Sequence, residues 1–176
     1  MARRRELLAL AVVLALPLPG CGWQPLYADR QSGPASEELT AIQVLPIPER
    51  IGQRLEMALR NSLNPTGEPT KPRYVLRTTL GVGLSALGIQ EQGTATLGRL
   101  DVSATCVLAD GRSGGVLLTT SLHVQNSFTL NPNQYSTVVG EDDAAVRSVA
   151  ELNQEIVTRL ALFMEHRAAQ NAPKAG

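Results

Sequence analysis

The stretch YVLRTTLGVGLS, residues 74–85, has the clearest periodicity in this chain of 176 residues. Its odd-numbered positions are mostly polar or glycine, and its even-numbered positions are mostly apolar: Tyr74, Leu76, Thr78, Leu80, Val82 and Leu84. Successive side chains of a β-strand point to opposite faces of the sheet. The alternation therefore predicts a long strand with one apolar face.

Two later runs repeat this alternation. The inward positions are Leu100, Val102, Ala104, Cys106 and Leu108 in the first run, and Val116, Leu118, Thr120, Leu122 and Val124 in the second. Residues 110–114 have the composition of a turn and separate the two runs. The three runs together predict an antiparallel meander with one apolar and one polar face. Cys106 is predicted to be buried on the apolar face as a free thiol.

The flanking segments predict a fourth strand and two helices. Thr40–Ile47 reads as a short strand that ends at its prolines, and Glu49–Leu63 has apolar residues at helical spacing. A longer amphipathic helix is predicted from Asp142 to His166, with Val146, Val149, Ile156, Leu160 and Phe163 forming its apolar stripe.

The predicted order is strand, helix, strand, strand, strand, helix. The first helix serves as a crossover, which makes the first strand parallel to the second. We therefore predict an α+β fold, a two-layer sandwich in which two helices pack on one face of a four-stranded mixed sheet. The other face of the sheet stays polar and meets water or a partner.

The N-terminus has the pattern of a secretory signal peptide. Three arginines at positions 3–5 precede an unbroken apolar run of twelve residues, Leu7–Leu18, which is shorter than the roughly 20 residues that cross a bilayer. Leu18, Gly20 and Cys21 resemble a bacterial lipobox, although Pro19 departs from the small residue usual there. Acyl chains on Cys21 would hold the protein on a membrane. The alternative is ordinary cleavage with a disulfide between Cys21 and Cys106.

These patterns predict four regions in the chain. Residues 1–20 form the signal peptide, 21–39 a lipidated tether, 40–168 a single α+β domain and 169–176 a flexible tail.

The composition argues against catalysis. His123 and His166 are the only histidines, and neither they nor the two cysteines have the spacing of a zinc site. The formal net charge is zero, so no basic excess points to nucleic acid. We expect a protein that is not an enzyme, with no cofactor, no metal and no nucleic acid partner.

Four segments resemble a known family. Cys21-Gly22-Trp23-Gln24-Pro25-Leu26-Tyr27 is similar to the start of the mature LPS-assembly lipoprotein LptE, and the likeness continues through residues 93–99, 135–137 and 141–144 into the last helix. The resemblance implies two helices against a four-stranded sheet and a location at the outer membrane. It also implies a non-catalytic role as a plug within the LptD barrel, in whose assembly the family assists, and binding of lipopolysaccharide. A different class remains open, an accessory lipoprotein of another envelope transporter or barrel-assembly machine.

Three arginines are candidate ligands for lipopolysaccharide phosphates, because the planar guanidinium group matches phosphate oxygens. Arg77 and Arg99 share the predicted polar face on neighbouring strands, and Arg73 stands at the start of the first of these strands. If the strands pair as a meander, we expect Arg77 and Arg99 to reach one phosphorylated head group. Isolated, solvated arginines are the alternative.

Overall fold

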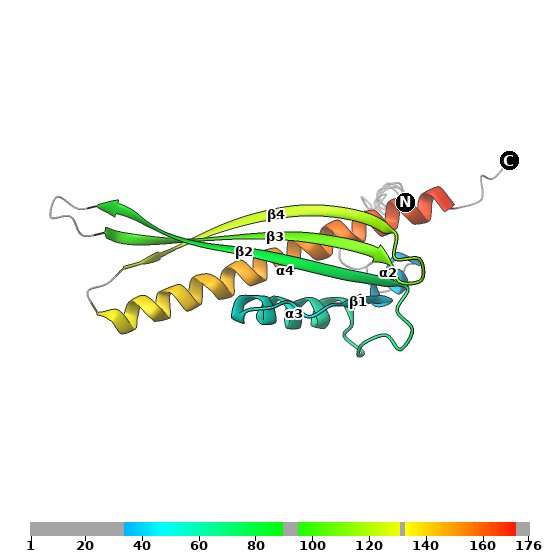
Figure 1. Cartoon of the computed structure of the whole chain (residues 1–176), viewed down its shortest axis with the longest axis horizontal. Helices are drawn as coiled ribbons and strands as arrows, with labels where there is room; N and C mark the ends of the chain where they lie inside the picture. The colour runs from blue at the N-terminus through cyan, green and yellow to red at the C-terminus, as the bar shows by residue number, and fades with distance from the viewer. Residues whose placement is uncertain (1–33, 90–94, 131–132, 172–176) are drawn as a thin grey trace, which may run out of the picture. The chain divides into compact units, whose positions relative to one another are not determined.

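A four-stranded sheet carries two long helices on one of its faces (Figure 1). The computed structural model describes residues 34–89, 95–130 and 133–171. In chain order its elements are α2 (Pro34–Thr40), β1 (Ile42–Val44), α3 (Arg50–Leu63), β2 (Tyr74–Ile89), β3 (Ala95–Asp110), β4 (Val116–Thr129) and α4 (Gln134–Asn171). The predicted α+β class is confirmed.

The strands lie in the order β1-β2-β3-β4. β2 and β3 form a long antiparallel pair whose register runs from Tyr74 opposite Asp110 to Ile89 opposite Ala95. β4 pairs antiparallel with β3, and the register shifts at Leu108/Ala109. β1 lies parallel to β2 but pairs only with residues 74–76. The predicted meander and the predicted parallel first strand are therefore both present.

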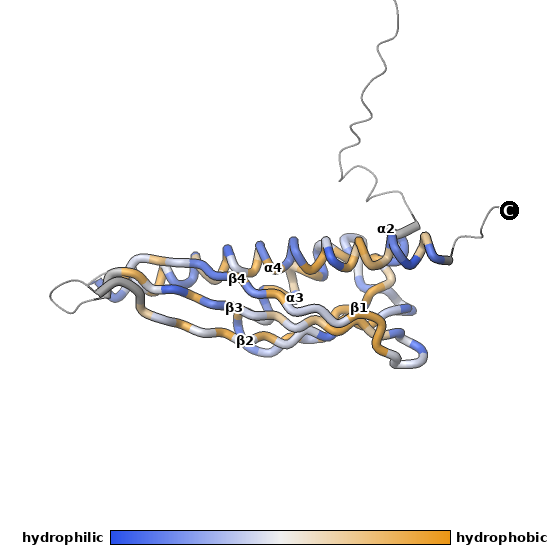
Figure 2. The backbone as a smooth tube through the Cα atoms, turned by 90° about the horizontal axis from the view of Figure 1, so that it is seen from above, coloured by the Kyte–Doolittle hydropathy of each residue, from blue (hydrophilic) through white to orange (hydrophobic). Residues whose placement is uncertain are grey.

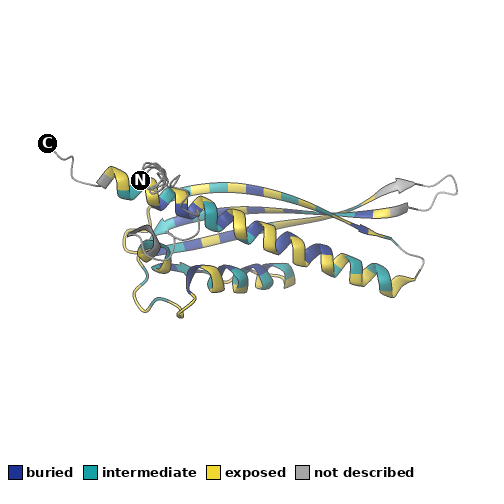
Figure 3. Ribbon diagram, turned by 180° about the vertical axis from the view of Figure 1, so that it is seen from behind, coloured by how far each residue is buried: buried dark blue, intermediate teal, exposed yellow. Residues whose placement is uncertain are grey.

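The core lies between the sheet and the two long helices. Its largest fully buried side chains come from alternate strand positions, from one face of each helix and from Ile47 between β1 and α3: Ile42, Ile47, Leu76, Leu100, Leu108, Leu55, Leu59, Leu63, Leu152, Ile156, Leu160 and Met164. Figure 3 shows this buried side of α4, and in Figure 2 the apolar residues of α4 lie toward the sheet. Cys106 is 2 % exposed, which confirms its predicted burial.

The last helix differs from its prediction in two ways. It begins at Gln134 rather than Asp142, because Asn133 caps it: the Asn133 Oδ1 atom accepts a hydrogen bond of 3.0 Å from the N–H of Tyr135. Its apolar stripe also differs at Val146, which is 50 % exposed, whereas the predicted Val149, Ile156 and Leu160 are buried. The helix continues to Asn171 and so includes the first residues of the predicted tail.

The first strand is shorter than predicted. Thr40 closes α2, and the strand pairing ends where the N–H of Leu45 donates to the Leu76 carbonyl at 3.0 Å. Pro46 follows and has no N–H to continue the ladder. The predicted tether over residues 21–39 overlaps α2, which is helical from Pro34; residues 21–33 lie outside the described part of the chain.

One carboxylate joins α2 to the start of β2. Arg73 Nη1 lies 2.6 Å from Glu38 Oε1, and the Tyr74 hydroxyl donates to Glu38 Oε2 at 2.6 Å. Burial raises the pKa of Tyr74, and its hydrogen bond to the Glu38 carboxylate raises this pKa further. We call this contact the Glu38 clamp.

The helices cover the sheet unequally. At 1.5 Å per helical residue, the 14 residues of α3 span about 21 Å and the 38 residues of α4 about 57 Å. The 16 residues of β2 span about 53 Å at 3.3 Å per residue. We call residues 74–78 of β2, beside β1 and α3, the covered end, and residues 80–86 the open end.

Candidate functional site

The face of the sheet that turns away from the helices, which we call the bare face, is polar. Its outward positions are mainly hydroxyl-bearing and other polar side chains: Arg77, Thr79, Ser103, Thr105, Ser121, His123 and Gln125. Thr105 and Ser121 are joined across β3 and β4 at 3.4 Å between their Oγ atoms. The predicted polar face is thus present, and such side chains keep their hydrogen bonds with water or with a wet partner surface.

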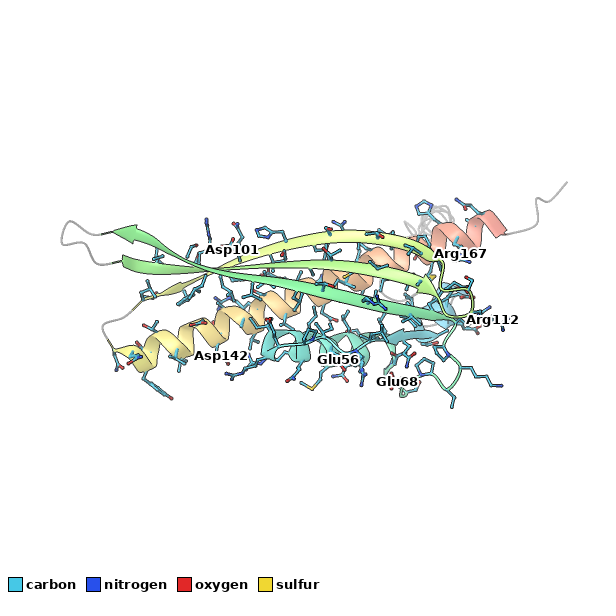
Figure 4. All side chains as sticks on the ribbon, in the orientation of Figure 1. Glu56, Glu68, Asp101, Arg112, Asp142 and Arg167 are labelled. Carbon is cyan, nitrogen blue, oxygen red and sulfur yellow. The ribbon has the colours of Figure 1, made fainter. Side chains whose placement is uncertain are left out.

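Asp101 is the centre of a small charged cluster on this bare face (Figure 4). Its Oδ2 atom lies 3.2 Å from Arg99 Nε, and its Oδ1 atom lies 3.6 Å from His123 Nε2. Gln125 Nε2 also lies 3.0 Å from His123 Nε2. His123 therefore lies on the polar side of its strand, opposite Ser103.

The register separates two of the three predicted arginines. Arg77 stands opposite Val107, whereas Arg99 stands opposite Ser85. These rows are eight residue steps apart along β2, which is about 26 Å. The expectation that Arg77 and Arg99 reach one head group is therefore wrong, although both are on the bare face as predicted.

The three arginines also differ in their partners. Arg73 is held by Glu38 in the clamp, and Arg99 is paired with Asp101. Arg77 is exposed, and among the described residues no carboxylate forms an ion pair with it. Arg77 is thus the arginine of this set whose charge is available to a ligand.

The helix-facing side of the open end contains a groove that the sequence pattern did not reveal. Its volume is about 390 Å³, and its apolar lining is Ile51, Val82, Leu84, Leu100, Val138 and Ala145. Val82 and Leu84 have the predicted inward parity, yet they are 44 % and 59 % exposed. The lengths of the elements explain this, because α3 begins beside the open end and does not extend over it. A comparison of predicted helix and strand lengths was the sequence signal that could have found the groove.

Charged side chains line the groove near the start of α3. One of them, Asp142 of α4, is labelled in Figure 4. Arg54 Nη2 lies 2.8 Å from Asp142 Oδ1, and Arg50 Nη2 lies 3.4 Å from the same oxygen. Glu49 and Glu141 also line the groove, and neither forms an ion pair within the described residues. Three carboxylates against two arginines leave the rim with a net charge of −1.

Cys106 contributes no surface chemistry. Its Sγ atom lies 3.6 Å from Thr78 Oγ1, and it is a free thiol. Burial raises the pKa of this thiol, which keeps it protonated and unreactive. The predicted acylation site, Cys21, lies outside the described residues.

Within residues 34–89, 95–130 and 133–171, no group of three His, Cys, Asp or Glu side chains is placed to hold a metal ion. No helix in the same part of the chain has the length and apolar character needed to cross a membrane.

Several solved structures share this architecture. A Caulobacter crescentus protein described as a lipoprotein is 19 % identical, with a TM-score of 0.63 over 77 % of this chain and 98 % of that one. The lipoprotein B of Nitrosomonas europaea is 13 % identical, with a TM-score of 0.56 over 74 % and 86 %. A minor lipoprotein of Acinetobacter baumannii is 19 % identical, with a TM-score of 0.54 over 70 % and 92 %.

These likenesses show a shared fold. No family model and no curated protein sequence matches the chain.

Proposed function

We propose that the chain is an outer-membrane lipoprotein, anchored through an acylated Cys21, that occupies the lumen of the LptD barrel. In this role it assists assembly of the barrel and transport of lipopolysaccharide. The observation that carries the proposal is the fold, which the chain shares with solved proteins described as lipoproteins. The lipobox-like Leu18–Cys21 and the following Gly22–Tyr27 support the anchor and the family.

The bare face of the sheet supports a position inside a wet barrel. The surface of a plug faces water and the polar wall of a water-filled lumen. Polar side chains on that surface keep hydrogen-bond partners there, whereas their burial without partners would cost free energy. The hydroxyl and amide side chains of the bare face meet this requirement.

Co-purification tests the partner. The chain is tagged at its C-terminus, extracted from envelope membranes in mild detergent and analysed by mass identification of the accompanying proteins. We expect the LptD barrel in near-equal amount with the wild type. Recovery of inner-membrane transporter subunits in its place would contradict the proposal and favour an accessory lipoprotein.

The intact mass of the purified chain should show acyl chains on a mature N-terminal Cys21, and Cys21→Ser should abolish them.

Arg77 is the residue proposed for contact with a lipopolysaccharide phosphate. One charge-assisted hydrogen bond contributes about 1.5–3 kcal/mol, and less at an exposed site. Arg77→Gln should therefore weaken binding of purified lipopolysaccharide several-fold. Arg112→Gln is the matched control, since Arg112 is an exposed arginine of the β3–β4 turn. Equal binding by the two variants would remove Arg77 from the site.

A further inference from the structure

The outer edge of β2 offers unpaired backbone groups over most of its length. The carbonyl of Leu76 accepts from Leu45 of β1, so Leu76 directs its backbone groups toward β1. Backbone groups alternate between the two edges of a strand. Every second residue after Leu76 therefore directs its N–H and C=O toward the same side: Thr78, Leu80, Val82, Leu84 and Ala86. Among the described residues, no backbone group pairs with β2 on this side beyond Leu76.

This edge lacks the features that usually protect an open strand. Natural edges carry charges, proline or bulges that prevent pairing with another chain. Residues 78–89 contain no charged residue and no proline, and the β2–β3 register has no shift among them.

The opposite edge of the sheet differs. There α4 packs against β4, and Arg147 Nη2 donates to the backbone carbonyl of Ser127 at 3.1 Å. Arg159 Nη1 also donates to Thr120 Oγ1 at 2.9 Å. Arg147 of α4 therefore occupies part of the β4 edge, whereas within the described part of the chain no charged side chain bonds to the outward backbone groups of residues 78–86 of β2.

The apolar groove lies along the helix-facing side of the same edge. Val82 and Leu84 belong to both features, since their side chains line the groove and their backbone groups point outward. A strand added at this edge would place every second side chain over the groove and the others on the bare polar face. Near the start of α3 the rim is acidic, because Glu49 and Glu141 lack ion-pair partners there.

We propose that the β2 edge binds an extended segment of the partner protein as a fifth strand. The segment has uncharged residues that alternate between apolar and polar, and a basic residue where it meets the start of α3. Main-chain hydrogen bonds to residues 78–86 supply the pairing, and apolar side chains that enter the groove supply the register. This inference rests on the proposed function, in which the partner is the barrel.

The experiment places a photo-crosslinking residue at position 84 of the full-length chain in envelope membranes, with position 123 on the bare face as the control. Crosslinked peptides are identified by mass. We expect position 84 to label a partner segment with the alternating composition described above.

Edge variants are then compared by co-purification. Val82→Pro removes an outward N–H, whereas Val82→Ala keeps it. We expect Val82→Pro to lower recovery of the partner about fivefold, the change that corresponds to one lost hydrogen bond of about 1 kcal/mol, and Val82→Ala to leave it nearly unchanged. Leu84→Lys adds a charge without altering the backbone and should also lower recovery of the partner. It replaces Val82→Pro as the test if that variant fails to fold.

The outcomes separate the two proposals. If the wild type recovers the barrel but position 84 labels no partner strand, or the edge variants recover the barrel normally, the β2-edge proposal is wrong and the proposed function stands. Labelling of a second copy of the chain, of its own N-terminal residues or of lipopolysaccharide alone also overturns it. If no barrel is recovered, the proposed function fails. The edge proposal, which rests on that function, then fails with it.

Discussion

The covered and open ends of β2 carry the same alternation and have different environments. Leu76 at the covered end is fully buried between β1, α3 and the rest of the core, whereas Leu84, on the same face of the same strand, is 59 % exposed. The side-chain pattern specifies the face of the sheet, and the length of the covering helix decides how much of that face is buried. The open end is therefore available for a partner because α3 begins beside it and does not extend over it.

Leucine truncation at the two ends should give the largest contrast. Leu76→Ala removes a fully buried side chain and should lower the free energy of unfolding by about 2–5 kcal/mol. Leu84→Ala should lower it by no more than about 0.5 kcal/mol, because its side chain is mostly in water already. Denaturant unfolding of the isolated chain measures both. Similar losses would mean that the open end is covered in solution.

Two glycines should sharpen the comparison, because the open end is tightly packed at one point. A Cβ atom on Gly98 would lie 2.4 Å from Cζ of Phe128, whereas one on Gly83 would meet Asp101 at ordinary contact distances, 3.8 Å from its Cβ and 4.0 Å from its carbonyl oxygen. Gly98→Ala should therefore cost about 1–3 kcal/mol as the ring is displaced. Gly83→Ala should stay within about 0.5 kcal/mol of wild type. Thermal unfolding separates the two, and a neutral Gly98→Ala would show that Phe128 is free to move.

At the covered end, Cys106 should make stability depend on alkaline pH. Burial raises the pKa of its thiol in the folded protein, so above the unfolded pKa of about 8.5 only the unfolded state loses the proton. Stability is then lost as pH rises, by about 1 kcal/mol over the first pH unit above that value. Cys106→Ala should have a flatter stability profile between pH 8 and 10 than wild type. Parallel profiles would contradict this assignment.

Much of the fold follows from periodicity, and the exceptions have local causes. The alternation over residues 74–85, 100–108 and 116–126 predicts the strands, the bare face and the burial of Cys106. It does not give the distance between Arg77 and Arg99, because this depends on register. The polar break at residues 90–93 approached that information: reflection about its centre places Arg77 opposite Cys106, one residue from the observed partner Val107.

The early start of α4 was missed for a different reason. Pro132 and Gly140 are residues that usually interrupt or weaken helices, and they concealed a helix that begins between them. The signal was Asn133, whose side chain caps the helix. The predicted helix lacked the eight residues before Asp142. It therefore could not place the apolar side chain of Val138 in the groove with Val82 and Leu84.

The Glu38 clamp has a mechanical consequence for a chain held at its N-terminus. A force applied at the N-terminal side acts first on α2. The contacts of Glu38 transmit this force to Arg73 and Tyr74 at the start of β2. The seven residues of α2 span about 10 Å as a helix and about 24 Å when extended. If the clamp and the packing of α2 against α4 and the core yield before the sheet does, α2 unwinds and lengthens the chain on that side by about 14 Å. The domain could then move relative to its anchor while its core stays folded.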